Sequence, residues 1–493
     1  MIHYWKLSSA IRDRIYIPKY YNPESERQVR KLAKTHNCLS IQKLLDDGIL
    51  LAETGHEIGK AAYGTGDIPF IRTSDISNWE IKSVPKQGVS LEIYNQFASI
   101  QDVKVGDILF VRDGTYLIGT NCFITEIDKD ILYQSHIIKF RILDSKALNP
   151  HLLFLALNNP WVQRQIRSFQ FTADIIDTIG QRFSEIILPI PQNHEYRIKL
   201  INECELALNN RMLGKAFIKQ CPKILEESLK VGNSETIEKY MSLSAEEKIS
   251  EASNETVSSE FGSFTSFWRD SSTIINQIFL PSYYDVKITN ELNALSEHSE
   301  LVSIRELVNS GFIEYHTGDE IGKREYNTGD IPFIRTSDFA NWEIYHTPKQ
   351  GISEEVYNKY AASQDIQEND ILIVRDGTYL VGSSCIITSK DVKSLFCGGL
   401  FKFRVLGGEL DPFLFLGIIN TYIVKRQFRT KQFTRDVIDT MGNRIDEVIL
   451  PIPKSVKLRS AISEAIREVI SSRISARDEI KKLAEGILSC EGV

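Results

Sequence analysis

The chain of 493 residues contains one long segment twice. Thr54 to Gly88 aligns with Thr317 to Gly351 at an offset of 263 residues, and 26 of these 35 positions are identical. Val111-Arg112-Asp113-Gly114-Thr115-Tyr116-Leu117 recurs as Val374-Arg375-Asp376-Gly377-Thr378-Tyr379-Leu380, and Leu188-Pro189-Ile190-Pro191 recurs as Leu450-Pro451-Ile452-Pro453. Each copy spans about 190 residues, which is too long for a solenoid repeat and is the size of a domain. The duplication therefore predicts two domains of the same fold.

The repeats divide the chain into five segments. We expect a first domain at 1–191, a helical tail at 192–231, an acidic, Ser-rich linker at 232–263, a second domain at 264–453 and a second tail at 454–493. The linker has no counterpart in the other half of the chain and contains no proline. Its composition predicts a solvated segment with at most one short helix.

Within a repeat, strands come first and helices late. Ile68–Arg72, Asp107–Arg112 and Ile137–Ile142 are short apolar runs typical of strands, and Asp113-Gly114 is typical of a tight turn. Pro150 to Phe169 has helical spacing after an N-terminal proline, which predicts one helix. The fold class that follows is α+β: two tandem mixed α/β domains joined by long helices.

The two tails have a period of 3.5 residues, which is the signature of a coiled-coil seam. The second tail has one polar member, Arg473, which coincides with Arg211 of the first. Two such helices in one chain are expected to pair antiparallel and to space the domains by roughly 45 Å, although each could instead pack on its own domain. Pro222 should break or kink the first helix. The seam positions are Leu200, Cys204, Ala207, Arg211, Gly214, Ile218, Cys221 and Leu225 in the first tail, and Ile462, Ile466, Val469, Arg473, Ala476, Ile480, Leu483 and Ile487 in the second.

Several functional classes find no support in the sequence. No apolar run is long enough to span a membrane, and the first residues lack the apolar region of a secretory signal. The seven cysteines include no CxxC pair, which argues against a disulfide framework or a zinc site and favours a cytoplasmic location. No phosphate-binding GxxxxGK[ST] loop and no HExxH occur, and Asn158-Asn159-Pro160-Trp161 is better explained as a helix surface than as a methyltransferase motif. We expect no bound metal or cofactor and no catalytic residue.

Carboxylates suited to acid–base work are few. Asp113 and Asp376, with Asp75 and Asp338, are the best candidates, but no histidine or second carboxylate recurs beside them in both copies. Asp113 before Gly114 is better explained by turn chemistry, and Asp75 by orientation of Arg72.

The residues that recur around predicted turns are instead of the kind that hydrogen-bond to base edges and phosphates. A bland alternative exists for each, such as a core position for Trp79. Candidate DNA-binding residues of the first copy are Arg72, Thr73, Ser74, Asn78, Trp79, Lys86, Gln87, Arg112, Thr115 and Tyr116, and those of the second are Arg335, Thr336, Ser337, Asn341, Trp342, Lys349, Gln350, Arg375, Thr378 and Tyr379.

A further group is basic and helical. Arginines three apart share a helix face suited to phosphates, although an ordinary solvated helix has the same pattern. The members are Arg164, Arg167 and Arg182 in the first copy and Lys425, Arg426, Arg429 and Arg444 in the second, with Lys431 and Arg435 added there. The net charge of −7 does not suggest a nucleic-acid binder, but the acidity is concentrated in the second repeat and the linker. Affinity for DNA would then depend on local stripes or on a partner, and binding by the isolated chain should be weak and salt-sensitive.

This combination resembles the specificity subunit of type I restriction-modification enzymes over nearly the whole chain, the linker excepted. The resemblance rests on Pro18-x-Tyr20-Tyr21 and its counterpart at Pro281, on Gly66-Asp67-Ile-Pro-Phe-Ile-Arg72, on Gly106-Asp107-Ile-Leu-Phe-Val-Arg-Asp-Gly114, and on Leu-Pro-Ile-Pro running into a long helix. It implies a non-catalytic subunit whose two target-recognition domains each read half of a bipartite DNA site. It further implies two adenine-N6 methyltransferase subunits that use S-adenosylmethionine, and a motor-nuclease subunit that uses ATP and Mg²⁺.

One departure is informative. Members of that family commonly carry two dissimilar recognition domains, whereas these two are closely alike, which predicts similar half-sites in inverted orientation. The copies differ at Lys82-Ser-Val84 against Tyr345-His-Thr347, and at Gln134-Ser-His136 against Cys397-Gly-Gly399. If those loops contact bases, the half-sites differ there.

Two other functions remain open at this stage. One is a stand-alone DNA-binding regulator or defence sensor without methyltransferase partners. The other is a nuclease acting through Arg112, Asp113 and Asp75, for which magnesium-dependent cleavage should be lost on Asp113→Ala.

Overall fold

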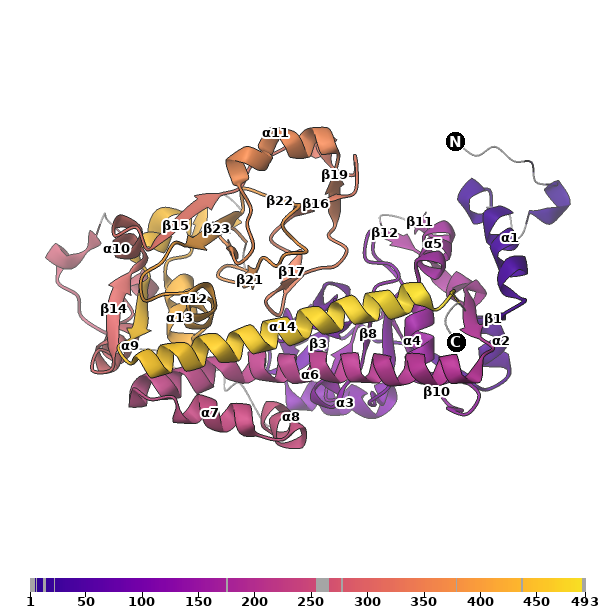
Figure 1. Cartoon of the computed structure of the whole chain (residues 1–493), viewed down its shortest axis with the longest axis horizontal. Helices are drawn as coiled ribbons and strands as arrows, with labels where there is room; N and C mark the ends of the chain where they lie inside the picture. The colour runs from indigo at the N-terminus through magenta and orange to yellow at the C-terminus, as the bar shows by residue number, and fades with distance from the viewer. Residues whose placement is uncertain are drawn as a thin grey trace. The chain divides into compact units, whose positions relative to one another are not determined.

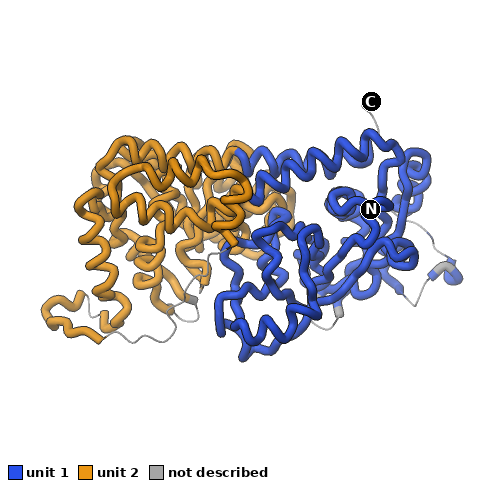
Figure 2. Tube along the Cα trace, turned by 90° about the horizontal axis from the view of Figure 1, so that it is seen from below, with its two compact units in different colours: residues 1–212, 472–493 blue, residues 213–471 orange. Residues whose placement is uncertain are grey.

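The computed structural model divides the chain into two compact units, and each unit draws on distant parts of the sequence (Figures 1 and 2). Unit 1 comprises Met1–Met212 with Ser472–Val493, and unit 2 comprises Leu213–Ser471. Each unit therefore contains one repeat, the start of the tail that follows it and the end of the other tail. The structure describes residues 5, 7–11, 15–21, 23–173, 176–253, 266–275, 278–377, 379–435 and 438–489.

The first repeat is built around an antiparallel four-stranded sheet in the order β2-β10-β7-β8. A second sheet, β6-β3-β9, pairs β3 antiparallel to β6 and parallel to β9. Two-stranded pairs β1-β13, β4-β5 and β11-β12 complete the fold. The strands are β1 (His36–Ser40), β2 (Leu50–Thr54), β3 (Ile68–Ile71), β4 (Ile76–Ser77), β5 (Glu80–Ile81), β6 (Gln87–Val89), β7 (Ile108–Val111), β8 (Asn121–Phe123), β9 (Leu132–Tyr133), β10 (Ile137–Ile142), β11 (Phe171–Ala173), β12 (Ile176–Thr178) and β13 (Ile187–Pro191).

The helices of the first repeat cover these sheets. They are α1 (Pro23–Leu32), α2 (Ile41–Asp46), α3 (Leu91–Gln101), α4 (Pro150–Asn158) and α5 (Pro160–Phe169). The single helix predicted from Pro150 to Phe169 is wrong, because the chain breaks at Asn159, which has extended backbone and caps α5 with its side chain at Trp161 N. The proline that follows explains the break, since a residue before proline avoids the helical region.

The second repeat has the same topology, strand for strand. Its sheets are β15-β23-β20-β21 and β19-β16-β22, with pairs β14-β26, β17-β18 and β24-β25. The α+β class predicted from the sequence is thus confirmed in both repeats. The strands are β14 (Ser299–Ser303), β15 (Ile313–Thr317), β16 (Ile331–Ile334), β17 (Phe339–Ala340), β18 (Glu343–Ile344), β19 (Gln350–Ile352), β20 (Ile371–Val374), β21 (Ser384–Ile386), β22 (Leu395–Phe396), β23 (Leu400–Val405), β24 (Phe433–Arg435), β25 (Ile438–Thr440) and β26 (Ile449–Pro453). The helices are α9 (Val286–Leu295), α10 (Ile304–Asn309), α11 (Glu354–Gln364), α12 (Pro412–Ile419) and α13 (Tyr422–Thr430).

The tails form the two longest helices, α6 (His194–Val231) and α14 (Val456–Gly486). All sixteen predicted seam residues are buried. In unit 1 the two helices run antiparallel, because Tyr196 donates to Gly486 O while Arg211, further along α6, donates to Arg473 O (Figure 1). In unit 2, Leu225 of α6 and Ile462 and Ile466 of α14 meet at Gly417 of α12.

Pro222 was predicted to break or kink the first tail; α6 runs through it without a break. A helix-interior proline removes one backbone hydrogen bond and crowds the preceding turn. Burial of Cys221, Ile224 and Leu225 on either side of it holds the helix together against that cost.

The linker prediction also needs correction where the structure describes it. Residues 235–253 form two helices, α7 (Glu235–Ser242) and α8 (Ala245–Ser253), rather than a solvated segment. Ile237, Tyr240 and Ala252 are buried, and the Tyr240 ring packs on Phe217 of α6 at 5.8 Å. A few well-spaced apolar side chains are enough to dock a polar segment. Residues 254–265 lie outside the described part.

The C-terminal end of α14 is held by the first repeat. The last carbonyls of a helix lack partners within it and must find them elsewhere. Here Asn159 donates to Ala484 O at 2.7 Å, Tyr196 donates to Gly486 O at 2.8 Å, and His36 Nε2 lies 2.8 Å from Ile487 O. Ile480 and Leu483 join the same buried cluster as Phe140 and Phe154 of the first repeat. The last turns of α14 are therefore part of the core of unit 1.

A buried ionic cluster joins the first repeat to both helices. The carboxylate of Glu80 in β5 lies 3.1 Å from Arg211 and 2.5 Å from Arg473. Each arginine also donates to the backbone carbonyl of the other, at 3.3 and 3.1 Å. All three residues are less than a tenth exposed. The arginine in each predicted seam, Arg211 or Arg473, is thus paired with the carboxylate of Glu80 from the first repeat.

We predict that Glu80→Gln destabilises the chain by about 3–5 kcal/mol, because it leaves buried arginines without this carboxylate. Urea unfolding of the full chain measures the effect. Glu126→Gln is the matched control: Glu126 pairs with Lys129 at 3.0 Å on the surface, where such pairs contribute at most about 1 kcal/mol. Equal, small effects of the two substitutions would contradict the role assigned to Glu80.

Candidate nucleic-acid interface

The first predicted group lies on a turn organised by a buried aspartate. Asp75 accepts the backbone N–H of Arg72 at 3.0 Å and that of Lys86 at 3.1 Å. Burial raises the pKa of Asp75, although the charge of Lys82 and these hydrogen bonds oppose the rise. Asp338 holds Arg335 in the same way, at 2.9 Å. The aspartates position the turn through its backbone, so the interpretation of Asp75 as an orienting residue is supported.

Within this turn the side chains differ in accessibility. Arg72, Thr73 and Ser74 are half-buried, as are Arg335, Thr336 and Ser337, while Lys86 is exposed. Each arginine lies near a tyrosine ring, Arg72 at 5.9 Å from Tyr63 and Arg335 at 5.8 Å from Tyr326. Gln87 is half-buried, whereas Gln350 is 9% exposed and Lys349 is partly covered, with its pKa lowered by burial and by Arg335. The two copies therefore present this edge differently.

Asn78 and Asn341, predicted to contact DNA, are buried in hairpin turns, which does not favour a surface role. They are 3% and 7% exposed and form, with Trp79 and Trp342, the tight turns of the β4-β5 and β17-β18 hairpins. All four residues have positive φ, between 47° and 65°, which asparagine tolerates better than most residues. Trp79 is a core residue whose ring N–H donates to Asn158 at 2.9 Å.

The second predicted group surrounds the Arg-Asp-Gly turn. Arg112 donates from Nε and from a terminal nitrogen to the carboxylate of Asp113, with the shortest contact at 2.7 Å. Thr178 of β12 also donates to this carboxylate, and His136 Nδ1 lies 2.8 Å from it. Burial alone would raise the pKa of Asp113, but the hydrogen bonds from Arg112, Thr178 and His136 hold it below the ordinary value.

The equivalent turn of the second copy has the same anchors except one. Asp376 accepts from Arg375 at 2.7 Å and from Thr440 at 2.5 Å, and Gly399 stands where the first copy has His136. The side chain of Asp376 is 24% exposed, against 8% for Asp113. These carboxylates are committed to turn anchoring. No cluster of three potential metal ligands occurs among the residues that the structure describes.

Hydrogen bonds from helices α5 and α13 hold the backbone of the exposed residues in these turns. Tyr116 and Tyr379 are 38% and 39% exposed, and Thr115 is also exposed. Arg167 donates to Tyr116 O at 3.0 Å, Arg429 to Tyr379 O at 2.7 Å, and Gln170 to Thr115 O at 2.9 Å. Thr378 lies outside the described residues.

The basic helical group divides into several roles. Arg164 is exposed, as the phosphate interpretation requires, whereas Arg426 pairs with Glu291. Arg182 and Arg444 stack on Phe171 and Phe433 at 4.0 and 3.8 Å and donate to backbone carbonyls. Lys431 covers the Tyr283 ring at 3.6 Å, and nothing is described of the Arg435 side chain. Most of these residues anchor the hairpin and turn, so a continuous phosphate stripe is not the arrangement found.

Lys425 is a partly buried cation rather than a fully exposed one. Its ammonium donates to Gly382 O at 2.5 Å, and burial, together with the charge of Arg429, lowers its pKa to about 7. The first copy has Gln163 at this position, which donates to Gly119 O at 3.1 Å. The copies thus use a neutral and an ionisable donor for the same contact.

In the second copy, the turn at Thr336 and the turn at Asp376 both approach the loop at 397–399. In the second copy, a Cβ built on Gly399 would lie 3.0 Å from Thr336 of the first group and 3.8 Å from Asp376 of the second. Sequence reasoning noticed that Gln134-Ser-His136 differs from Cys397-Gly-Gly399, but it did not place His136 on Asp113. It also missed Thr178 and Thr440, although Ile-Asp-Thr recurs in both copies and was available as a signal.

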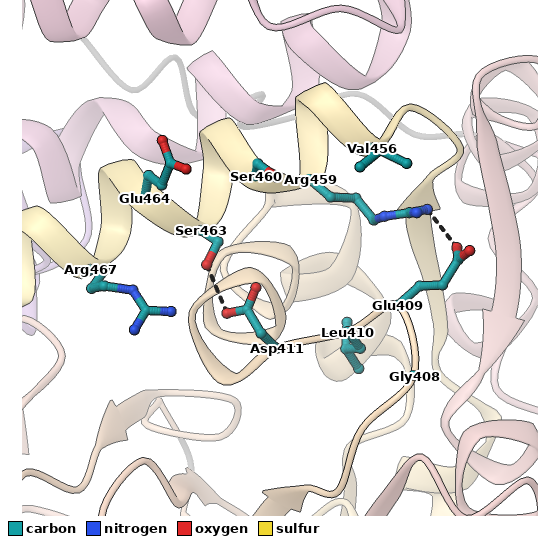
Figure 3. Close-up of a pocket in the computed structure, with 10 residues that line it drawn as sticks. All are labelled: Gly408, Glu409, Leu410, Asp411, Val456, Arg459, Ser460, Ser463, Glu464 and Arg467. Atoms are coloured by element: carbon teal, nitrogen blue, oxygen red, sulfur yellow. Dashed lines mark hydrogen bonds and ion pairs between the residues drawn. The ribbon is translucent and has the colours of Figure 1, made fainter.

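A separate cavity of about 620 Å³ lies in unit 2 (Figure 3). It is lined by the start of α14 and the residues that precede α12. Arg459 pairs with Glu409 at 2.6 Å and Ser463 donates to Asp411 at 2.8 Å across it, while Arg467 covers the Phe413 ring. None of the predicted DNA-binding residues lines it, and its charges are largely paired.

Comparison with known proteins gives matches among solved structures. No family profile matches the chain, and no curated protein matches it. The S subunit of a type I restriction-modification system from M. genitalium covers 92% of this chain and 94% of its own at 11% identity, with a TM-score of 0.32. The HsdS subunit from Thermoanaerobacter tengcongensis covers 93% and 94% at 15% identity, with a TM-score of 0.24.

A third match comes from a structure described as showing complex assembly and conformational transition of the type I R-M system. It covers 92% of this chain and 96% of its own at 13% identity, with a TM-score of 0.27. The chain is similar to type I S subunits along nearly its whole length. All three TM-scores lie below 0.5, so function is argued below from the chain's own residues. In the described part, no helix is long and apolar enough to cross a membrane.

We predict that Lys425→Gln stabilises the chain at neutral pH. The pKa is lowered from 10.5 in the unfolded chain to about 7, so the folded state disfavours the charged form. The cost is fully present below pH 7 and disappears as the pH rises towards 10.5. The substitution should therefore add at most roughly 4 kcal/mol at pH 7 and progressively less at higher pH.

Thermal unfolding of both proteins across pH 7 to 10 tests this expectation. The control is Lys43→Gln, which changes an exposed lysine paired with Asp47 and should give a small effect that does not grow as the pH is lowered from 10 to 7. A destabilised Lys425→Gln protein at pH 7 would show that the ammonium is better accommodated than its burial indicates.

Proposed function

We propose that the chain is the DNA sequence-specificity subunit of a type I restriction-modification complex. In this proposal each repeat reads one half of a bipartite double-stranded DNA site. The chain itself is not catalytic. It directs methyltransferase and motor-nuclease subunits to that site.

One observation carries the proposal: the chain presents the same Arg-Asp-Gly turn twice, each with an exposed tyrosine whose backbone is held by hydrogen bonds. Arg167 and Arg429 fix the turn from a helix, Thr178 and Thr440 fix it from a hairpin, and Tyr116 and Tyr379 remain open to solvent at nearly equal fractions. Sequence reading of DNA needs side chains that are exposed but held in place, because base edges are discriminated by hydrogen-bond geometry. The motifs that bear these turns are those on which the family resemblance rests.

The helices fit the same proposal. A two-fold axis relates the two helices of an antiparallel pair. Arg211 of α6 and Arg473 of α14 are related in this way in unit 1, because each donates to the backbone carbonyl of the other. Two like recognition domains carried on such a pair would read like half-sites in inverted orientation, separated by a gap that the helices set. The target would then be interrupted and near-palindromic.

The proposal includes partners that supply the chemistry. A chain with a net charge of −7 and few free basic side chains at its turns needs added positive surface for tight binding. Two adenine-N6 methyltransferase subunits would provide this positive surface and use S-adenosylmethionine. A motor-nuclease subunit would use ATP and Mg²⁺.

Affinity purification of the tagged chain from its native host tests the partner assignment. A DNA methyltransferase should co-purify. High salt should remove it, and this removal should weaken binding of the complex to a DNA duplex more than the same change of salt weakens binding of the isolated chain. Recovery of the chain without a methyltransferase, together with tight specific DNA binding at physiological salt, would instead support a stand-alone regulator.

We predict that Tyr116→Ala with Tyr379→Ala lowers the affinity of the complex for its specific duplex roughly tenfold. The reason is that these rings are the exposed aromatic members of both turns. Tyr16→Ala, at a tyrosine that is 75% exposed outside the turns, is the control. Fluorescence anisotropy with a labelled duplex measures the change. Loss of affinity in the control alone would place the DNA elsewhere.

A further inference from the structure

The loop at 134–136 has the same backbone anchorage as its counterpart at 397–399. Arg112 N and Arg375 N donate to the carbonyls of His136 and Gly399, both at 2.9 Å. The next residues, Asp113 and Asp376, donate to the same carbonyls at 3.3 and 3.2 Å. Gln134 N and Cys397 N donate to the ends of β3 and β16, both at 3.0 Å. Side-chain identity therefore does not set the course of this loop.

A pair of glycines explains why the course is shared. A Cβ at Gly55 would lie 2.3 Å from Tyr133 O, and a Cβ at Gly318 would lie 2.3 Å from Phe396 O. Such contacts are too close for any side chain, so both positions must remain glycine while the loop passes over them. The loop is thus seated on backbone in each repeat.

The side chains on this common backbone are different. In the first repeat, His136 Nδ1 lies 2.8 Å from Asp113 Oδ2, and Ser135 donates to Glu57. In the second repeat both positions are glycine. The side chain of His136 is 36% exposed, and none of the described residues hydrogen-bonds to its Nε2. Because Asp113 is an ionised acceptor, Nδ1 is the protonated nitrogen and Nε2 is the atom left for a ligand.

We propose that His136 is a base-reading residue of the first recognition domain, and that Gly399 makes the second domain blind to the corresponding base pair. This inference rests on the proposed function and deepens it. Nε2 offers one hydrogen-bond acceptor when the imidazole is neutral and one donor when it is charged, either of which suits a single base edge. Asp113 is then a positioning residue that orients the ring, as Arg112 and Thr178 orient Asp113.

The second repeat cannot acquire this contact without rearrangement. A Cβ at Gly399 would lie 3.0 Å from Thr336 Cγ2, so any side chain there must displace Thr336. The half-sites are therefore expected to differ at the base pair that faces this loop. This part of the difference between the copies lies in three side chains, at 134–136 and 397–399.

The test exchanges the loop between copies. The full chain carrying Gln134→Cys, Ser135→Gly and His136→Gly is compared with the unaltered chain by selection from a duplex DNA library with a randomised central segment, at low salt. The unaltered chain should recover two inverted half-sites that differ at the base pair facing this loop. The exchanged chain should recover a target that is symmetric at that base pair, with a roughly tenfold loss of preference there. His136→Ala alone should give the same loss without adding glycine freedom.

Ile100→Ser is the matched control, since it also replaces an exposed residue of the first repeat by its counterpart, Ser363, and should leave the recovered sequence unchanged. Identical half-sites for the unaltered chain, or an unchanged asymmetric target for the exchanged chain, would overturn the role of His136 while leaving DNA recognition intact. Recovery of no consensus by a folded, unaltered chain would overturn the proposed function and this inference with it.

Discussion

The carboxylate of Glu80, held between Arg211 and Arg473, is the interaction on which unit 1 depends. It joins three segments that are far apart in the sequence: a short strand of the first repeat, the middle of the first long helix and the middle of the second. Charges buried in this way tolerate no slippage, because a shift of either helix would set an arginine against apolar side chains. The cluster thus fixes the register of the helix pair. It also means that unit 1 cannot complete its core until α14, at the far end of the chain, has been made.

In the predicted recognition surface, most polar residues of the repeated motifs hold the turns in place, and only a few are exposed. Hydrogen bonds of Asp75, Asp113 and Arg167 hold the turns, and Arg182 stacks on Phe171 of the hairpin. Thr115 and Tyr116 face solvent. Motif residues that look suited to DNA contact can therefore be scaffolding. The side chains that distinguish the two copies lie between the motifs, on backbone that the motifs hold.

Much of this was accessible from the sequence. The duplication predicted two domains of one α+β fold, and the heptad spacing predicted every buried seam position, because both signals are carried by local pattern. The burial of Asn78 and Asn341 could not be predicted, because a buried hairpin turn and an exposed loop favour the same residue. Pro222 was expected to break or kink the first long helix, which runs through it without a break and is buried on both sides of it. The contact of His136 with Asp113 joins residues 23 positions apart across a sheet edge, and no local pattern reports such a pairing. The anchoring of the last turns of α14 by His36 and Asn159 is beyond local pattern for the same reason.

The seating of the 134–136 loop on Gly55 has a consequence for how a lineage of such chains could change. The same main-chain hydrogen bonds hold the loop in both copies, and glycines at the equivalent positions of the second copy keep the same path. Point changes at these three positions should therefore cost little folding stability beyond the loss of the contacts of Ser135 with Glu57 and of His136 with Asp113. Substitutions that accumulate in the loop would then change binding with little loss of folding stability. Under the proposed function, a gene of this kind could change its target one base pair at a time, with one copy preserving a working half-site while the other varies.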